Sequence, residues 1–247
     1  MPHEQVTIRA SDGDCPTHVF TPPGEGPWPA VIFYMDGLGI RPSLLEMGQR
    51  LADGGYLVLL PDLYYRFGPY APLNPKALAE SGTVMEAIGP MFVTTSSHKA
   101  VADTVAFLAY LDTRKDVCGT GIGTTGYCMG GAMSLTVSGE HADRVAAAAS
   151  FHGGGLVTDQ PDSPHLSARK AKGRLYIAHA VEDPYCPPEM IAALDTVLDE
   201  AGVDYTSEVY EGALHGWTVP DSPIYNHDAA ERHWDALFGL LKGTLAV

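Results

Sequence analysis

Short apolar runs alternate with amphipathic stretches along most of this chain, and this alternation limits the fold more than any other feature of the sequence. Ala30–Tyr34 and residues 56–60 are apolar runs of the kind found in strands buried on both faces. Between them, residues 43–54 place Leu44 and Leu51 on one side of an expected helix. Strands that alternate with helices predict an α/β fold, with a mainly parallel sheet covered by helices on both faces.

The same alternation continues to the end of the sequence. Further strands are expected over 121–127, 145–151, 175–180 and 205–210, and further helices over 77–88, 98–111, 130–137, 189–201 and 229–245. The N-terminal region differs, because the turn residues 11–14 separate two short strand-like runs and predict an antiparallel hairpin. The longest irregular piece, 153–172, is expected to be a surface excursion within one domain that covers residues 1–247.

The charge balance argues against several classes of partner. There are 30 acidic residues against 15 Lys and Arg, which gives a formal net charge of −15. Nucleic acids and anionic membranes attract basic surfaces, so neither is expected to bind here. The sequence contains no apolar stretch long enough for a membrane span and no signal-peptide pattern, and its four cysteines lack zinc-site spacing. We expect a cytoplasmic monomer or small homo-oligomer with reduced thiols, without a metal or organic cofactor.

The segment Gly126-Tyr127-Cys128-Met129-Gly130 has the G-x-nucleophile-x-G form of a nucleophile elbow, with cysteine where serine usually stands. It joins an expected strand to an expected helix. The glycines allow the strained turn that holds a nucleophilic side chain in the open. Because only a thiolate is a strong nucleophile, a neighbouring group must control the Cys128 proton.

Two polar residues that could control this proton follow the last two expected strands. These residues are Asp183 and His215. Since the carboxyl ends of parallel strands share one edge of a sheet, both side chains should meet Cys128 there. The order nucleophile, acid, histidine is that of the α/β-hydrolases. Asp62 is a rival acid, but it precedes the nucleophile and fits a turn after a strand.

This set of residues predicts nucleophilic acyl chemistry. His215 would take the proton from Cys128 and return it to the leaving group. Asp183 would fix the tautomer of His215 and stabilise its imidazolium form. The backbone N–H of Met129 would bind the developing oxyanion at the start of the following helix, and a second N–H would come from the loop after Ala30–Tyr34.

The chain resembles the dienelactone hydrolase family, which consists of α/β-hydrolases with a cysteine nucleophile. The resemblance extends over nearly the whole chain. Its motifs are Gly126-Tyr-Cys-Met-Gly-Gly131, Pro61-Asp-Leu-Tyr64, Gly54-Gly-Tyr56, Val181-Glu-Asp-Pro184 and Glu211-Gly-Ala-Leu-His215. The resemblance implies an α/β-hydrolase fold and a small-molecule ester or lactone as substrate. It also implies hydrolysis through a triad of Cys128, His215 and Asp183, with a thioester acyl-enzyme.

The resemblance further implies roles for the loop after Ala30–Tyr34. In the family a carboxylate at this place, usually glutamate, holds the thiol and shapes the resting site. This sequence has Asp36 there, which is one methylene shorter. Gly37 would then donate the second oxyanion hydrogen bond through its N–H, and Leu38 would line the substrate pocket.

The sequence departs from the family archetype where substrate recognition is concerned. The archetype binds its substrate's carboxylate with two arginines, one of them four residues after the catalytic histidine, where this chain has Val219. The second arginine should fall within 76–99, which contains none. Arg41 and Arg66 are possible substitutes. The substrate is therefore open between a dienelactone, a simple activated ester and a bulkier lactone.

Some residues admit a structural role beside the functional one. Tyr127, His152 and Trp217 are candidate substrate contacts, but aromatic rings could equally pack in the core, and glycines beside His152 could serve a simple turn. Asp183 could act only as an acid at a helix start before Pro184.

The other three cysteines and three further histidines are not expected to act in catalysis. Small buried side chains are expected at Cys15, Cys118 and Cys186, and exposed ones at His98, His227 and His233. Two other classes of protein remain open. One is a non-catalytic binding protein with the α/β-hydrolase fold. The other is a redox sensor built on Cys128, although the sequence offers no nearby resolving cysteine.

Overall fold

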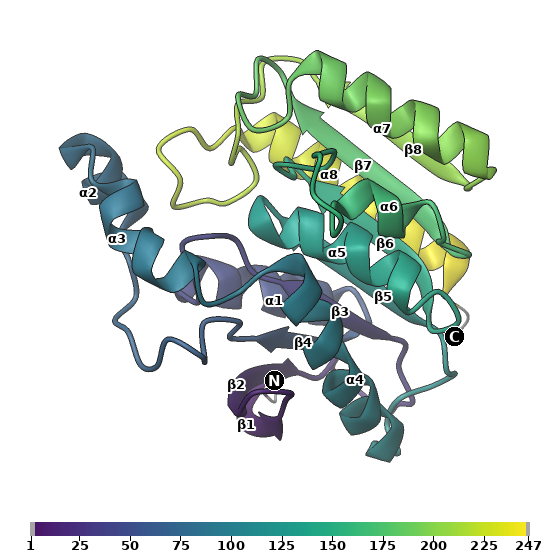
Figure 1. The fold of residues 1–247 in the computed structure, drawn as a ribbon. Helices are drawn as coiled ribbons and strands as arrows, with labels where there is room; N and C mark the ends of the chain where they lie inside the picture. The colour runs from purple at the N-terminus through teal and green to yellow at the C-terminus, as the bar shows by residue number, and fades with distance from the viewer. Residues whose placement is uncertain (1–2, 246–247) are drawn as a thin grey trace.

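An eight-stranded mixed sheet forms the centre of the computed structural model, which describes residues 3–245 (Figure 1). Residues 1, 2, 246 and 247, which the one-domain prediction included, lie outside the described part. The strand order is β1-β2-β4-β3-β5-β6-β7-β8. The strands are β1 (His3–Arg9), β2 (Asp14–Phe20), β3 (Ala30–Tyr34), β4 (Leu57–Pro61), β5 (Ile122–Tyr127), β6 (Val145–Phe151), β7 (Arg174–Ala180) and β8 (Tyr205–Tyr210).

Helices cover both faces of this sheet. One face carries α4, α5, α6 and α7, and the other carries α1 and α8, while α2 and α3 extend away from the body as an arm (Figure 1). The helices are α1 (Pro42–Asp53), α2 (Pro75–Ser81), α3 (Val84–Phe92), α4 (Ser97–Thr113), α5 (Met129–Glu140), α6 (Pro164–Ala168), α7 (Pro188–Ala201) and α8 (His227–Thr244).

The strand directions confirm the predicted fold class. β1 and β2 form an antiparallel hairpin with Arg9 opposite Asp14, and β2 pairs antiparallel with β4. From β4 through β3 to β8 all neighbours are parallel. Among residues 3–245, no helix has the length and apolar character needed to cross a bilayer.

Burial follows the position of each strand in the sheet. Every residue of β3, β4 and β5 is buried, as expected for strands with helices on both faces. β8 lies at the sheet edge, and only its last residue, Tyr210, is buried. The carboxyl ends of β3, β5, β6 and β7 are therefore buried, and close packing there can hold side chains in fixed positions.

The arm differs from the single helix predicted over 77–88. Two short helices occupy this region, because Gly82 adopts a left-handed φ of 67° and ends α2. Asn74 caps the start of α2 by accepting a hydrogen bond from the Ala77 N–H. The irregular stretch 153–172 also contains a short helix, α6, which begins at Pro164.

The expected exposure of His233 is wrong. This side chain is fully buried on α8, where its Nε2 lies 3.2 Å from the Tyr127 hydroxyl. Its Nδ1 makes a short hydrogen bond with the Ala230 carbonyl. Burial lowers the pKa of His233 to about 3, so the ring stays neutral and acts as a core residue. His98 and His227 are exposed, as predicted.

Candidate active site

Cys128 occupies a strained turn between β5 and α5. Its φ of 54° and ψ of −116° lie outside the usual regions for an L-residue, at a cost of about 1–3 kcal/mol. Crowding explains the two glycines of the motif. A Cβ on Gly126 would lie 1.8 Å from the Gly130 carbonyl oxygen, and one on Gly130 would lie 2.2 Å from the Tyr34 carbonyl oxygen. The glycines allow close packing, and the unusual dihedral angles fall on the cysteine itself.

His215 and Asp183 come together as their places after β8 and β7 predict. The distance from His215 Nδ1 to Asp183 Oδ2 is 2.7 Å. Asp183 is buried, and its other oxygen accepts a hydrogen bond from the Tyr185 N–H at 2.9 Å. A carboxylate can only accept, so the His215 proton lies on Nδ1 and the lone pair of neutral His215 lies on Nε2.

The Nε2 atom of His215 interacts with Cys128. Burial alone would lower the pKa of His215, but the hydrogen bond to Asp183 and the nearby Cys128 sulfur outweigh it and raise the pKa to about 10. Nε2 is buried and makes no complete hydrogen bond within the described residues. Catalytic hydrogen bonds are often loose in a ligand-free site and tighten when substrate binds.

The two segments expected to form an oxyanion hole lie side by side. Tyr64 is buried between them: its hydroxyl donates to the Gly37 carbonyl at 2.8 Å and lies 3.9 Å from the Met129 sulfur. Met129 is the first residue of α5, where backbone N–H groups lack acceptors within the helix. Within the described residues the Gly37 N–H has no hydrogen-bond partner, whereas the Leu38 N–H donates to Asp36. Both amides named from the sequence are therefore available.

Asp36 is turned toward an arginine. Its two carboxylate oxygens accept hydrogen bonds from Arg41 at 2.7 and 2.8 Å. Arg41 is almost fully buried, and it also contacts Asp221 through Nε at 2.8 Å and Nη2 at 3.2 Å. The guanidinium is thus shared between two carboxylates. Arg66, the other possible anion-binding residue, pairs with Asp103 and Asp12 instead.

Three of the four expected substrate contacts are buried. Tyr127 lies before the nucleophile on a strand, so its ring points to the other face, where it packs against Phe151. Trp217 is fully buried against Tyr210. His152 is 1% exposed. These placements do not fit direct substrate contact. Leu38 alone of the four is partly exposed.

Two exposed aromatic side chains border the site instead, and no sequence motif pointed to either of them. The Tyr185 ring lies 4.8 Å from the His215 ring and is 56% exposed. Phe92, on α3, covers Gly37: its ring would lie 3.3 Å from a Cβ at that position. Phe92 is 40% exposed. One aromatic ring thus lies beside His215 and another beside Gly37.

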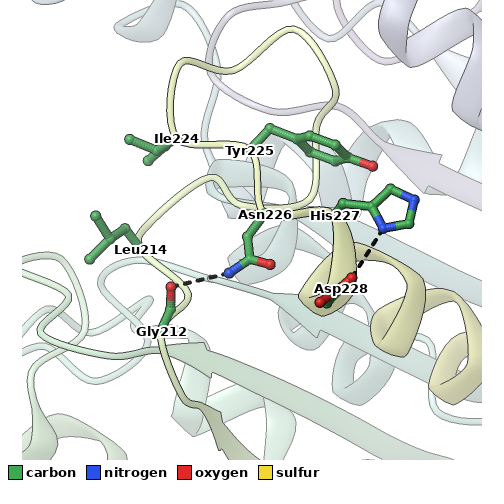
Figure 2. A pocket seen from close by; sticks show the side chains of 7 residues that line it. All are labelled: Gly212, Leu214, Ile224, Tyr225, Asn226, His227 and Asp228. Carbon is green, nitrogen blue, oxygen red and sulfur yellow. Dashed lines mark hydrogen bonds and ion pairs between the residues drawn. The ribbon is translucent and has the colours of Figure 1, made fainter.

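The loop between β8 and α8, residues 211–226, also borders a separate surface hollow of about 410 Å³ (Figure 2). Leu214 and Ile224 lie on one side of this hollow and the rings of Tyr225 and His227 on the other. The Asn226 side chain donates to the Gly212 carbonyl at 3.2 Å and closes the base of the loop. None of Cys128, Asp183 and His215 lines the hollow, so it is not the candidate active site.

The model of the dienelactone hydrolase family matches residues 15–245. This chain belongs to the dienelactone hydrolase family. A Synechocystis protein named "Putative carboxymethylenebutenolidase" is 27% identical over 243 residues, which cover 97% of this chain and 96% of the relative. Family membership identifies the chain as a hydrolase with a small-molecule substrate.

Solved structures share the fold of this dienelactone hydrolase family member. A Klebsiella pneumoniae protein described as a "Putative Dienelactone Hydrolase" superposes with a TM-score of 0.83 at 19% identity, covering 98% of each chain. The dienelactone hydrolase-like promiscuous phosphotriesterase P91, from metagenomic libraries, gives a TM-score of 0.75 at 22% identity and covers 99% of each chain. The α/β-hydrolase fold expected from the sequence is thus confirmed.

Proposed function

We propose that this protein hydrolyses carboxylic esters or lactones, with Cys128 as nucleophile, His215 as general base and acid, and Asp183 as its partner. One observation carries the proposal. Cys128 stands at a strained elbow beside His215, whose other ring nitrogen is held 2.7 Å from a buried carboxylate. This arrangement activates a nucleophile and keeps its base in one tautomer.

In the acylation half of the reaction, His215 Nε2 takes the proton from the Cys128 thiol, and the sulfur attacks the carbonyl carbon. The carbonyl oxygen becomes an oxyanion, which the N–H groups of Met129 and Gly37 stabilise. His215 then gives its proton to the departing alkoxide as the C–O bond breaks. The raised pKa of His215 favours the imidazolium form that makes this transfer. For a lactone the alcohol stays attached to the acyl group.

In the deacylation half, His215 takes a proton from water, and the hydroxide attacks the thioester carbonyl. The same two N–H groups stabilise the second oxyanion. The C–S bond breaks, the acid leaves, and the sulfur regains its proton from His215.

Asp36 has an indirect role in both halves of the reaction. Its carboxylate accepts a hydrogen bond from the Leu38 N–H, so it shapes the loop that carries Gly37. In the structure its carboxylate is held by Arg41 and does not contact the thiol.

The charge pattern favours an uncharged substrate. Arg41 already serves two carboxylates, Val219 is buried, and the rim residues Tyr185 and Phe92 are aromatic. We therefore expect a simple or bulky apolar ester to react faster than an anionic dienelactone. Comparison of a dienelactone with its methyl ester tests this expectation, and a strong preference for the acid would contradict it. Because P91 is described as a phosphotriesterase, an uncharged phosphotriester belongs in the same panel.

The decisive experiment compares ester hydrolysis by the wild type, Cys128→Ala and Cys118→Ala. Cys118 precedes β5 and is partly buried, so it provides a matched control at the opposite end of the strand. We expect Cys128→Ala to lose hydrolysis and Cys118→Ala to retain it. Equal rates in wild type and Cys128→Ala would refute the proposal. A folded wild type without activity on any member of the panel would favour the non-catalytic alternative.

A further inference from the structure

Three non-glycine residues with positive φ follow three neighbouring strands of the sheet. Cys128, with φ 54°, follows β5; His152, with φ 42°, follows β6; and Glu182, with φ 53°, comes shortly after β7. L-residues rarely adopt this conformation, and such outliers cluster at functional sites. Cys128 is the proposed nucleophile, and Glu182 directly precedes Asp183. His152 lies between them, and the proposed reaction does not use it.

The two ring nitrogens of His152 connect the elbow to the loop that carries His215. Nδ1 lies 3.1 Å from the Cys128 backbone nitrogen, and Nε2 lies 2.7 Å from the Thr218 hydroxyl oxygen. A backbone N–H can only donate, so Nδ1 must be the unprotonated nitrogen. The proton therefore lies on Nε2 and is donated to Thr218. The Cys128 N–H is shared between His152 and the Phe151 carbonyl, which lies 3.0 Å away.

The surroundings of His152 hold it in this single neutral form. Its ring packs edge-to-face against His215 at 5.1 Å and against Trp217 at 4.9 Å. Tyr127 also faces it, with ring centroids 6.1 Å apart. Burial, followed by the nearby His215 and His233, lowers the pKa of His152 well below its ordinary value. A protonated ring would also point an N–H at the Cys128 N–H.

We propose that His152 is a positioning residue that fixes the separation between the Cys128 sulfur and His215 Nε2. One nitrogen fixes the peptide that leads into the elbow. The other fixes Thr218, three residues after His215. The two reacting side chains come from different strands, and His152 is the side chain that hydrogen-bonds to both segments. This inference rests on the proposed function, because it concerns the same thiol and imidazole.

The test uses two variants and a control. His152→Leu removes both hydrogen bonds of the ring, and Thr218→Val removes one hydroxyl without changing the shape of the side chain. The control, Thr17→Val, makes the same change in β2. Thr17 is as buried as Thr218, and its hydroxyl contacts the Cys15 carbonyl, far along the chain from the site. The loss of one hydrogen bond should lower kcat by about 10-fold in Thr218→Val. Misplacement of the reacting groups should lower kcat by about 100-fold in His152→Leu. KM should stay within about twofold of the wild-type value in both variants. Thr17→Val should retain the wild-type kcat.

The second readout is the pH profile of Cys128 alkylation by iodoacetamide, which needs no substrate and so separates this inference from the proposed function. We expect Thr218→Val and His152→Leu to shift the midpoint of this profile, because the thiol and His215 no longer keep their separation. A structural role alone would lower the melting temperature and leave the profile in place. Wild-type kcat and an unchanged profile in folded Thr218→Val would overturn the proposal, even if His152→Leu fails to fold.

Discussion

Two cysteine–histidine pairs lie near the same carboxylate, Asp183. Cys128 and His215 belong to the candidate site, whereas Cys186 and His179 form a buried pair, with 3.6 Å between Cys186 Sγ and His179 Nδ1. Asp183 hydrogen-bonds to His215, whereas His179 Nε2 lies 3.2 Å from the Ser207 hydroxyl. The two pairs thus have the same residue types but different second partners.

Burial and partners give the pairs opposite properties. Burial raises the pKa of the Cys186 thiol to about 12, and nearby Asp183 and Asp195 add to the increase. Burial lowers the pKa of His179 to about 4, against a smaller opposing effect of Asp183. Both groups therefore stay neutral near pH 7. In the other pair, the hydrogen bond that His215 donates to Asp183, together with the nearby Cys128 sulfur, outweighs the effect of burial and raises the pKa of His215 to about 10. The two pairs differ in whether a carboxylate accepts a hydrogen bond from the histidine and so stabilises its imidazolium form.

The largest expected effect comes from removing the carboxylate that distinguishes the pairs. Asp183→Asn should reduce kcat by about 10³–10⁴-fold, because the amide no longer holds the correct tautomer or stabilises the imidazolium. Steady-state kinetics on an activated ester measures the loss. Asp195→Asn is the matched control, since Asp195 and Asp183 both line a second hollow of about 260 Å³, which is distinct from the hollow in Figure 2. If both variants lose activity equally, Asp183 has no special role.

Alkylation compares the two thiols directly. At pH 7 a thiol with a pKa of about 12 is a thiolate in only about one molecule in 10⁵, so Cys186 should react very slowly. We expect iodoacetamide to label Cys128 at least about 100-fold faster than Cys186 in the same sample. Peptide mass spectrometry over time gives both rates. Equal labelling would remove the contrast between the pairs.

The neutral histidine of the buried pair, His179, predicts acid sensitivity. Unfolded histidine gains a proton below about pH 6.5, but folded His179 stays neutral down to about pH 4. The unfolded state therefore binds more protons in this window, and stability falls as the pH drops through it. The loss assigned to His179 is on the order of 3 kcal/mol at pH 4.

Urea unfolding at pH 7 and pH 4 measures this contribution. His179→Gln should lose less stability between the two pH values than the wild type does. His98→Gln, at an exposed position on α4, serves as the control and should match the wild type. An identical pH dependence in His179→Gln and wild type would show that His179 is protonated in the folded state.

The smallest effect is expected from the inert thiol. Cys186→Ala should cost about 1 kcal/mol of stability through lost packing and leave kcat within about twofold. Denaturant unfolding and ester kinetics on one preparation measure both quantities. A large loss of kcat would mean that Cys186 supports Asp183, whose carbonyl accepts the Cys186 N–H at 3.2 Å.

The sequence predicted the sheet well because its strands carry strong local signals. Ala30–Tyr34, Val145–Phe151 and Tyr205–Tyr210 were placed with their observed bounds. The arm was predicted less well, since Gly82 can continue or end a helix and only its φ of 67° decides. The burial of a single side chain is harder to predict, as His233 shows. An amphipathic pattern does not say how far a histidine at the border of the apolar face is buried.

The sequence predicted those residues of the candidate site whose position is determined by the end of a strand. Cys128, Asp183 and His215 follow strands whose order brings them to one edge. The direction of Asp36 was not predictable, because it depends on Arg41 and on Asp221, which lies 185 residues after Asp36 in the chain. The burial of Tyr127 and Trp217 depends in the same way on distant packing partners. Side-chain direction and rim composition are properties of the folded molecule.

Several hydrogen bonds hold the loop that carries His215, which limits how far this loop can be engineered. His215 is held by Asp183, Thr218 by His152 and Asp221 by Arg41, and the Asn226 N–H donates to the Trp217 carbonyl at 3.1 Å. Replacement or lengthening of this loop would disturb several anchors at once. The arm of α2 and α3 extends from the body and is mostly exposed, so it is the part to exchange when new substrate ranges are sought.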